Sequence, residues 1–431
     1  MSARDRRIGW LLLATLLLAA CAGPATEAPG EAPAPTSAPA TEAPEPTEVP
    51  MPEAPEFIDI GAVIPLTGPF AGGGSQVKNG YEFAVEAVNA TGGVYVAEFG
   101  AQVPLRLTVL DDESDPTKTV SNLETLFADQ NVTAYLGGFG SSLHAAAAAI
   151  AEKNQVPYLG VAFAQWDIHQ QGYQYLFSPF WKSPLIATEV FEMLNALIPE
   201  GERPTRVAIF SETTDWGIEL GGLWEEAAPA YGYEIVVHEE YAPQTPDFTD
   251  LILRAQAGQA DMLLALPIPP DGTTMVRQMG ELGWAPKFSF IVRAPDNPAW
   301  SENLGKVGDF VTLGPGWHNS MLFPGVEAIN QKHTEVVGRP ADPMVGPSYA
   351  VIEILADAIE RAGTLDRAVI RQALAETDLE TVIGHVSFNE DGTGNVLAPI
   401  LQYINGKQEL IWPTDFATAE LVYPAPAYDQ R

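Results

Sequence analysis

The stretch that decides the fold is IGAVIPLTGPFAGGGSQVKNG, residues 60–80, which passes from an apolar strand pattern through a triple glycine into a helix pattern. A Walker phosphate loop places Lys and then Ser or Thr directly after its last glycine, whereas Gly74 is followed by Ser-Gln-Val. Val77 also stands where a dinucleotide-binding loop needs its third glycine. The stretch therefore predicts a strand, a bare loop with free amides and a helix over about Ser75–Ala90, and it argues against a nucleotide site.

Residues 1–20 have the pattern of an export signal, because three arginines precede the apolar run Ile8–Ala20, which is too short to span a bilayer. The run ends in Leu-Ala-Ala before Cys21, and this pattern resembles the lipobox of bacterial lipoproteins, in which the cysteine carries the lipid. The alternative is an ordinary signal peptide with an incidental cysteine. Because Cys21 is the only cysteine of the chain, an intramolecular disulfide is excluded.

Residues 21–56 form a predicted tether between this cysteine and the folded body. From Pro24 to Glu56 the chain consists mainly of Pro, Ala, Thr and Glu without Lys, Arg or aromatic residues, and such a composition cannot bury enough apolar surface to fold. Removal of the signal takes away three arginines and one aspartate, which leaves 19 basic and 55 acidic residues and a formal charge of −36. Nucleic acid is therefore not an expected partner, because its binding depends on basic patches that neutralise phosphate.

The body alternates short apolar runs with longer amphipathic stretches, and this pattern predicts an α/β fold with parallel sheets and crossover helices. The runs fall into two series. The first comprises Ile58–Pro65, Leu105–Asp111, Ala134–Gly137 and Pro157–Val161, and the second comprises Arg206–Ser211, Glu234–Glu239, Met262–Leu266 and Phe288–Val292. Between the two series, Tyr175–Pro184 is extended and contains two prolines, so we expect a crossover between two lobes there.

The C-terminal third of the body predicts further crossings between the lobes. An extended segment is followed by three helix patterns, a strand-like run and a hairpin around Asn405-Gly406, which is a favoured two-residue turn. These segments are Val311–Trp317, then Val326–Val337, Ser348–Ala362 and Asp366–Ala375, then Val382–Phe388, and finally Pro399–Ile404 with Gln408–Trp412. A chain that passes repeatedly between two lobes makes a hinged cleft, and such clefts close on ligands.

Four stretches, taken in order, carry a family resemblance: IGAVIPLTGPFAGGGSQVKNGYEFAVEAVNATGGV, LTVLDDESDPTKTVSNLETLF, YLGGFGSSLHAAAAAIAEKNQVPYL and HQQGYQYLF. Over nearly all of residues 58–413 the chain resembles the leucine/branched-chain amino-acid binding proteins, the type I solute-binding proteins of ATP-binding cassette importers. The resemblance implies two doubly wound parallel-sheet lobes joined by a three-crossing hinge, with a ligand cleft between them. It places lobe 1 at 57–179 plus 315–382, lobe 2 at 180–314 plus 383–424, and a tail at 425–431.

In the first lobe we expect the ligand to meet loops that follow strand ends. Phe70 and Gly73 belong to the glycine loop, which we expect to form one lip of the cleft and to keep its rim bare for an entering side chain. Ser141 and Ser142 open a helix, where they either cap it or, as the resemblance implies for Ser141, grip the polar end of a ligand. The segment Ala162-Phe163-Ala164-Gln165 leaves the next strand, but Ala164 stands where amino-acid binders of this family offer a threonine hydroxyl.

The second lobe departs from the family at the positions that hold a ligand ammonium. Pro269 stands where an aromatic residue is usual, and Ala294 stands near the expected acidic partner of the ammonium. Either Asp271 or Asp296, at a neighbouring position, is a candidate to supply the negative charge that pairs with the ammonium.

Other positions of the second lobe and the hinge are better suited to a ligand. Asp215 and Trp216, at a strand-to-helix turn, and Trp317, after a crossing, match positions that line the ligand side chain in relatives. Arg293 at a strand end either pairs with a ligand carboxylate or forms an ion pair with one of the many acids of the chain.

Metal and enzyme chemistry find no support in the sequence. The acids at positions 111–115 suggest a calcium loop, but Pro116 occupies the position where an EF-hand turn needs glycine, so we expect Asp115 to cap the next helix instead. G-x-S-x-G and H-E-x-x-H are absent, and the six histidines are scattered. The sequence thus predicts no metal, no cofactor and no catalytic residue.

Together these observations predict a lipid-anchored, extracytoplasmic and monomeric solute-binding protein that presents its ligand to a membrane permease. A sensory receptor with the same cleft is one alternative, and a secreted hydrolase is a second. An amino-acid ammonium buried without a carboxylate partner costs several kcal/mol. A carboxylate or amide held by Ser141, with its body against Trp216 and Trp317, therefore suits the residues better than leucine.

Overall fold

The computed structural model describes residues 51–431, which form one compact unit. The predicted export signal, Cys21 and most of the predicted tether fall within residues 1–50 and lie outside the described residues. Among residues 51–431, no helix has the length and apolar character needed to cross a membrane.

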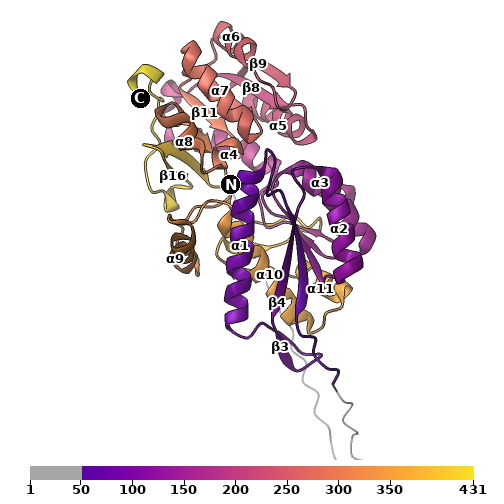
Figure 1. The fold of residues 1–431 in the computed structure, drawn as a ribbon. Coiled ribbons are helices and arrows are strands. Elements are labelled where there is room, and N and C mark those ends of the chain that lie inside the picture. Colours follow the sequence, from indigo (N-terminus) through magenta and orange to yellow (C-terminus); the bar gives the residue numbers. More distant parts are fainter. Residues whose placement is uncertain (1–50) are drawn as a thin grey trace, which may run out of the picture. The chain divides into compact units, whose positions relative to one another are not determined.

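The first lobe is built on a sheet of five parallel strands, in the order β4-β1-β5-β6-β7 (Figure 1). The interior strand β1 has the sequence IDIGAVI and is buried except at Asp59, as expected for a parallel strand covered on both faces. The strands are β1 (Ile58–Ile64), β4 (Leu105–Asp111), β5 (Ala134–Leu136), β6 (Tyr158–Leu159) and β7 (Leu176–Phe177). All four runs of the first predicted series are therefore strands of one sheet, and β7 adds an edge strand that the prediction treated as crossover.

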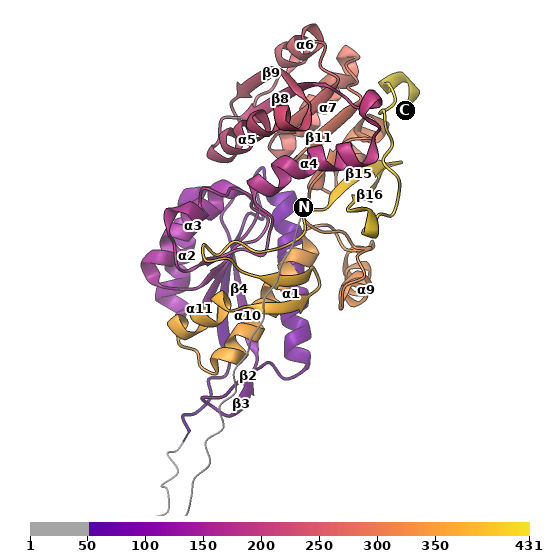
Figure 2. The same ribbon diagram turned by 180° about the vertical axis from the view of Figure 1, so that it is seen from behind.

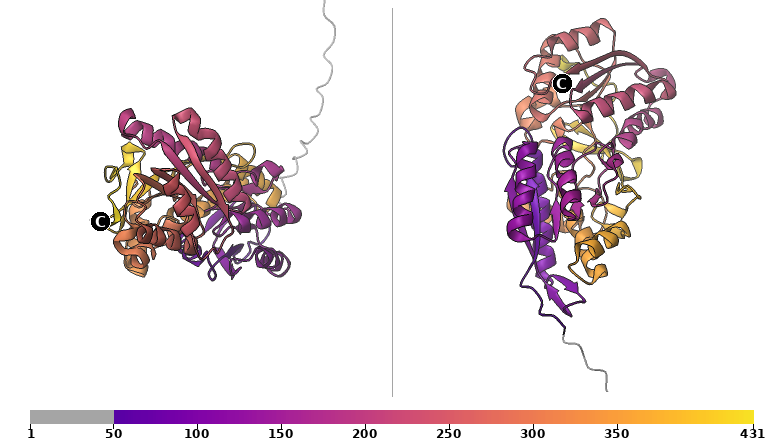
Figure 3. Two further views of the ribbon diagram at one scale, coloured as in Figure 1. Left: turned by 90° about the horizontal axis from the view of Figure 1, so that it is seen from above. Right: turned by 90° about the vertical axis from the view of Figure 1, so that its right-hand side faces the viewer.

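Helices cover both faces of this sheet. On one face α1 packs against α10, and on the other α2 packs against α3, so that Ile64 of β1 lies in one apolar core and Val63 lies in the other. Helices α10 and α11, drawn in orange, lie beside the N-terminal elements, although α1 ends at Ala90 and α10 begins only at Val345 (Figure 2 and the right panel of Figure 3). The bounds are α1 (Ala71–Ala90), α2 (Pro116–Gln130), α3 (Ser141–Asn154), α9 (Val326–Val337), α10 (Val345–Ala362) and α11 (Arg367–Ala375).

The triple glycine lies inside a helix and not in a bare loop. Helix α1 begins at Ala71, four residues earlier than predicted, because the glycines pack closely against their surroundings. A Cβ at Gly73 would overlap the ring of Phe139, and a Cβ at Gly74 would overlap the carbonyl of Pro65. The expectation that the glycines keep the cleft rim free is therefore wrong for Gly73 and Gly74, which allow α1 to start directly against the first sheet.

The second lobe contains a seven-stranded sheet in the order β16-β15-β12-β11-β10-β8-β9. Strands β9 to β12 run parallel to β8 in this sheet, and the predicted hairpin adds β15 and β16 in antiparallel fashion, with φ of 51° and 76° at Asn405 and Gly406. The strands are β8 (Arg206–Glu212), β9 (Glu234–Tyr241), β10 (Met262–Leu266), β11 (Phe288–Ile291), β12 (Thr312–Leu313), β15 (Ile400–Ile404) and β16 (Lys407–Trp412). The helices are α4 (Ser183–Leu197), α5 (Asp215–Tyr231), α6 (Thr249–Ala257), α7 (Pro269–Leu282) and α8 (Trp300–Leu304).

Within residues 51–431 the chain passes three times between the two lobes, after β7, after β12 and after β14. The first and third crossings lie side by side, because Ser178 donates its N–H to Gly392 O and accepts from Gly394 N, each at 2.9 Å. Two small antiparallel ladders complete the fold, β2 (Val94–Val96) with β3 (Ala101–Val103) and β13 (Asp378–Thr381) with β14 (Gly384–Ser387). The C-terminal residue is bound to the second lobe, since the Arg431 guanidinium donates to Val307 O and Asp309 O.

We predict that Gly74→Ala destabilises the protein by about 1–3 kcal/mol, because the new methyl group meets the rigid carbonyl of Pro65. The matched control is Gly222→Ala in α5, where a Cβ meets nothing within 4 Å and should stabilise by about 0.4–1 kcal/mol. Urea unfolding of both variants tests the packing role. Equal stability of Gly74→Ala and the parent protein would contradict it.

Candidate functional site

A small cavity of about 40 Å³ lies between the two lobes and takes its walls from both. The first lobe contributes Phe70, Ser141, Ser142 and Gln165, and the second contributes Glu212, Thr214, Asp215, Trp216 and Arg293. These residues follow the carboxyl ends of β1, β5 and β6 in one sheet and of β8 and β11 in the other. Open α/β sheets bind their ligands at that edge, so the cavity is the candidate site.

The first-lobe wall is formed by the start of α3 and the loop after β6. Gly140, with φ of 108°, precedes the helix, and no described side chain caps it. Ser141 Oγ instead accepts the N–H of Gln165 at 3.4 Å, which ties the start of α3 to the neighbouring loop. The capping role considered for Ser141 and Ser142 is therefore wrong, and the N–H groups of the first turn of α3 have no side-chain acceptor from the helix start.

The second-lobe wall contains a buried ion pair between Arg293 and Glu212. One guanidinium nitrogen lies 2.6 Å from a carboxylate oxygen, and the two side chains are only 5% and 1% exposed. Arg293 also donates through Nε to Pro267 O at 3.2 Å. Its guanidinium lies 5.0 Å from the ring centre of Trp216 and 5.4 Å from that of Phe70. Because Phe70 belongs to the other lobe, this cation–π contact joins the lobes across the cavity.

The backbone at Arg293 is strained. Its φ of 71° and ψ of −50°, with a hydrogen bond from Ala294 N to Val292 O at 2.9 Å, define a γ-turn of the rare hand. Such conformations cost about 1–3 kcal/mol and persist where the surrounding structure holds them. The strain directs Arg293 toward Glu212 and the cavity, and this is the kind of position at which functional side chains occur.

The two acids that the sequence offered as partners of an ammonium are both buried, but neither is among the described residues that line the cavity. Burial raises the pKa of Asp296 to about 8, against the opposing effect of Arg293, and Oδ1 has no hydrogen-bond partner among residues 51–431. Burial also raises the pKa of Asp271 to about 6, and its carboxylate accepts from Gln244 N at 2.8 Å. Asp296 is thus a buried acid with a raised pKa outside the cavity, and Glu212 is the buried acid that lines it.

Several other predicted residues lie outside the set that lines the cavity in the described chain. Phe163 points into the first lobe, where it is stacked between His144 and His169 with ring centres 4.3 and 5.6 Å apart. Trp317 is fully buried in the hinge and donates to Val382 O at 2.9 Å. Ala162 and Ala164 are buried in the loop after β6, Gly73 lies against Phe139, and Pro269 opens α7. The structure therefore does not support direct ligand contacts for these residues in this closed arrangement.

Sequence reasoning missed Glu212 and Thr214. Glu212 is the last residue of β8, and Thr214 follows in the turn immediately before the predicted Asp215 and Trp216. Thr214 caps α5 by accepting from Gly217 N at 3.1 Å. Thr214 also donates to Glu212 at 2.9 Å. The position of Glu212 as the last residue of a parallel strand was an available signal, because carboxyl-end residues face the binding edge.

A second contact between the lobes lies beside the cavity. Glu219 on α5 accepts the backbone N–H groups of Trp166 and Asp167 at 2.9 and 2.8 Å. The two amides directly follow Gln165, which lines the cavity. Glu219 therefore acts as a clasp that ties α5 of the second lobe to the binding loop of the first.

Ser178 and Lys182 of the first crossing form a serine–lysine pair. Ser178 Oγ lies 2.7 Å from Lys182 Nζ, a pairing that some hydrolases use, but Ser178 is fully buried and out of reach of a substrate. Residues 51–431 hold no group of three or more His, Cys, Asp or Glu side chains that is suited to a metal ion.

Comparison with known proteins gives one consistent result. The family model for periplasmic binding proteins matches residues 58–408. Leu/Ile/Val-binding protein homolog 7 of Brucella abortus is 25% identical over 389 residues, covering 85% of this chain and 94% of its own. The Leu/Ile/Val-binding protein BraC3 of Rhizobium johnstonii is 25% identical over 339 residues, covering 78% and 88% of the two chains.

Solved structures share the fold at lower identity. The leucine-binding protein LivK of Thermotoga maritima has a TM-score of 0.74 at 22% identity, covering 83% of this chain and all of its own. A solute-binding protein of R. palustris, solved with benzoate, has a TM-score of 0.71 at 15% identity, covering 86% and 98% of the two chains. The predicted fold class, two parallel-sheet lobes of the type I periplasmic binding protein kind, is thereby confirmed.

We predict that Glu219→Ala shifts the protein toward more open arrangements of the lobes. Hydrogen bonds to a charged group contribute about 1.5–3 kcal/mol, and partial exposure of this carboxylate favours the lower end. Small-angle X-ray scattering should then show a larger radius of gyration. Glu226→Ala, an exposed acid on the same helix, is the control and should leave the scattering curve unchanged. A Glu219→Ala curve identical to that of the parent would show that the clasp does not hold the lobes together.

Proposed function

Because the chain belongs to the periplasmic binding protein family, we propose that it captures a small carboxylate or carboxamide between its lobes and delivers it to the permease of an ATP-binding cassette importer. Family membership makes it a solute-binding protein of the Leu/Ile/Val transporter type, with an extracytoplasmic location. The ligand class, the delivery and the lipid anchor are proposals, and each rests on particular residues.

The guanidinium of Arg293 is the observation that carries the ligand class. It is the one cationic group among the described residues that line the cavity, and Ser141 and Ser142 of the other lobe line the same cavity. Guanidinium, hydroxyl and free helix-start amides all donate hydrogen bonds, and carboxylates and amides accept them. The rings of Phe70 and Trp216, whose centres lie 5.4 and 5.0 Å from the guanidinium of Arg293, offer an apolar surface for the body of the ligand.

The cavity offers a poorer site for an amino-acid ammonium than for a carboxylate. Glu212 is the buried acid of the cavity, but its charge is already paired with Arg293 at 2.6 Å. An entering ammonium must compete with that guanidinium or settle beside the exposed Asp215. A ligand without an ammonium avoids the competition. The benzoate complex of the R. palustris protein supports the proposal to the extent that a protein of this fold accepts an aromatic carboxylate.

Binding requires the lobes to part. A cavity of about 40 Å³ is far smaller than the 300–1,000 Å³ typical of small-molecule sites, so the arrangement described is closed without room for a benzoate-sized molecule. Entry must break the contacts of Arg293 with Phe70 and of Glu219 with the Trp166 and Asp167 amides, and a ligand that re-forms them on closing is retained. Trp216 lies at this interface and provides an optical signal.

We predict that benzoate and short aliphatic carboxylates change the tryptophan fluorescence at lower concentrations than leucine does. Arg293→Met should weaken carboxylate binding by roughly 1.5–3 kcal/mol, about 10- to 150-fold in Kd, through the loss of charged hydrogen bonds. The double variant Glu212→Gln/Arg293→Met controls for the unpaired acid that the single variant leaves behind. Tight leucine binding that is insensitive to Arg293→Met would overturn the carboxylate preference but leave solute capture intact.

Anchoring is a separate part of the proposal and depends on residues outside the described structure. The small residues before Cys21 supply the lipobox pattern, and the Pro- and Glu-rich residues 24–50 supply a spacer that keeps the body accessible to a permease. Since the described body begins at Met51, the anchor and the ligand site are separate regions of the chain.

We predict that Cys21→Ser moves the protein from the membrane fraction to the soluble extracytoplasmic fraction, because a chain without its lipid has no other anchor in this proposal. The purified variant should bind the same ligands with unchanged Kd. Cell fractionation with immunodetection measures the first outcome and calorimetry the second. Retention of Cys21→Ser in the membrane fraction would refute lipid anchoring at this cysteine.

A further inference from the structure

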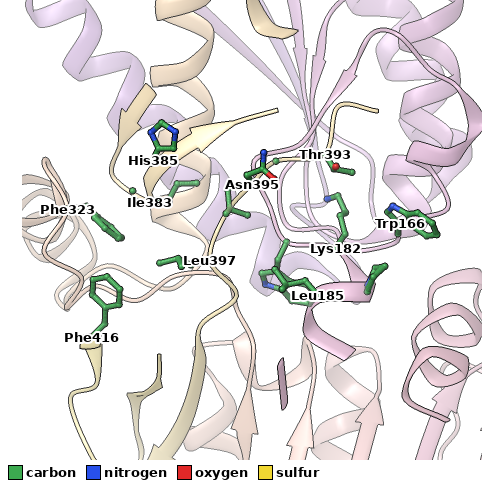
Figure 4. Close-up of a pocket in the computed structure, with 15 residues that line it drawn as sticks. Trp166, Lys182, Leu185, Phe323, Ile383, His385, Thr393, Asn395, Leu397 and Phe416 are labelled. Atoms are coloured by element: carbon green, nitrogen blue, oxygen red, sulfur yellow. The ribbon is translucent and has the colours of Figure 1, made fainter. Parts of the chain in front are cut away.

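A larger cavity, here called the hinge cavity, lies where the crossings meet the two lobes (Figure 4). Its volume is about 730 Å³, within the 300–1,000 Å³ range of small-molecule sites. Its walls come from the loop after β6, the first crossing and start of α4, the β13–β14 turn, the third crossing, and two aromatic residues, Phe323 and Phe416. The cavity therefore touches both lobes and is distinct from the small cleft cavity.

The walls include several exposed apolar side chains. Trp166 is 37% exposed, Leu185 is 39% exposed and Leu397 is 39% exposed, and these are three of the ten large hydrophobic residues exposed among residues 51–431. Figure 4 shows side chains from separate segments around one space, with the aromatic rings of Phe323 and Phe416 on its far side from Trp166. An apolar concavity of this kind favours the apolar body of a ligand.

The wall also holds a buried cation. Lys182 is only 6% exposed, and its ammonium donates to Phe163 O at 2.9 Å and to Ser178 Oγ at 2.7 Å and lies 3.8 Å from the centre of the Phe163 ring. In the part of the chain that the structure describes, no carboxylate lies within 4 Å of it, and Glu219 and Asp391 act only from a distance. Burial lowers the pKa of Lys182 well below its ordinary value, as expected for a cation without a counter-ion.

The hinge cavity and the cleft cavity share one wall. Gln165 lines the cleft and the next residue, Trp166, lines the hinge cavity. The same loop is held by Lys182 at Phe163 O and by Glu219 at the amides of Trp166 and Asp167. A molecule in the hinge cavity therefore contacts the loop that forms part of the binding cleft.

We infer that the hinge cavity is a second binding site, which takes a small amphipathic carboxylate with its apolar body against Trp166, Leu185 and Leu397 and its carboxylate toward Lys182. The apolar walls provide the transfer free energy of the body, and the carboxylate supplies the counter-ion that the buried ammonium lacks. The inference does not depend on which ligand the cleft binds.

Octanoate is the probe, and 1-octanol is its uncharged counterpart. Leu397→Glu places a negative charge on the wall and should weaken octanoate binding at least about tenfold by calorimetry. Leu253→Glu, at a leucine that is 46% exposed on α6, is the matched control and should bind octanoate like the parent. Lys182→Met should reduce the affinity for octanoate to about that for octanol, while octanol binding stays unchanged. If this buried variant does not fold, Leu397→Glu still tests the inference, because position 397 is exposed.

Because the proposed function assigns carboxylates to the cleft, octanoate binding at the two sites must be separated. Ser142→Trp fills the cleft from an exposed lining position, and octanoate binding to the hinge cavity should persist in it. Binding that is lost in Ser142→Trp and intact in Leu397→Glu would place the probe in the cleft alone and overturn the inference, while the proposed function would stand. Octanoate binding that neither variant changes would also overturn the inference. Self-association of the parent protein that Leu397→Glu abolishes, in a parent that binds no octanoate, would overturn it too.

Discussion

The pairing of the first and third crossings at Ser178 is the constraint on which the geometry of both cavities depends. Two backbone hydrogen bonds hold Ser178 against Gly392 and Gly394, and the strand β7 before it is paired into the first sheet. Five residues later α4 begins in the second lobe. With so little chain between fixed points, rotation about the crossings is the main freedom left to the lobes, and such rotation opens or closes the facing carboxyl edges of the two sheets.

The parts of the fold set by local patterns could be predicted from the sequence. The strand runs Leu105–Asp111 and Met262–Leu266 match the structure residue for residue. Met262–Leu266 is apolar and buried at every position, as expected for a parallel strand covered on both faces, whereas Leu105–Asp111 is an edge strand that mixes apolar and polar residues. Asp115 and Pro116 start α2 as expected, with the carboxylate accepting from Thr117 N at 2.8 Å. The two-residue strand β7 was missed because two residues carry no periodicity, and its pairing is decided by its neighbours in space.

The site was predicted less well than the fold. Arg293, Trp216 and Ser141 line the cavity as expected, but the role of the glycines was misjudged, since composition alone does not distinguish a bare loop from a tightly packed helix start. The interest in Asp271 and Asp296 followed from their positions along the chain, whereas their burial behind the cavity depends on packing. Glu212 was overlooked because its importance comes from its contact with Arg293, 81 positions later in the sequence. Pairings between distant residues are the information that a single sequence does not contain.

The loop that separates the two cavities imposes a thermodynamic symmetry. If a molecule in the hinge cavity changes the free energy of the cleft by acting on residues 163–167, a cleft ligand must change the affinity of the hinge cavity by the same factor. The occupancy of the cleft would then depend on the concentrations of both solutes. Where the coupling is favourable, the lobes would be most fully closed when both solutes are present.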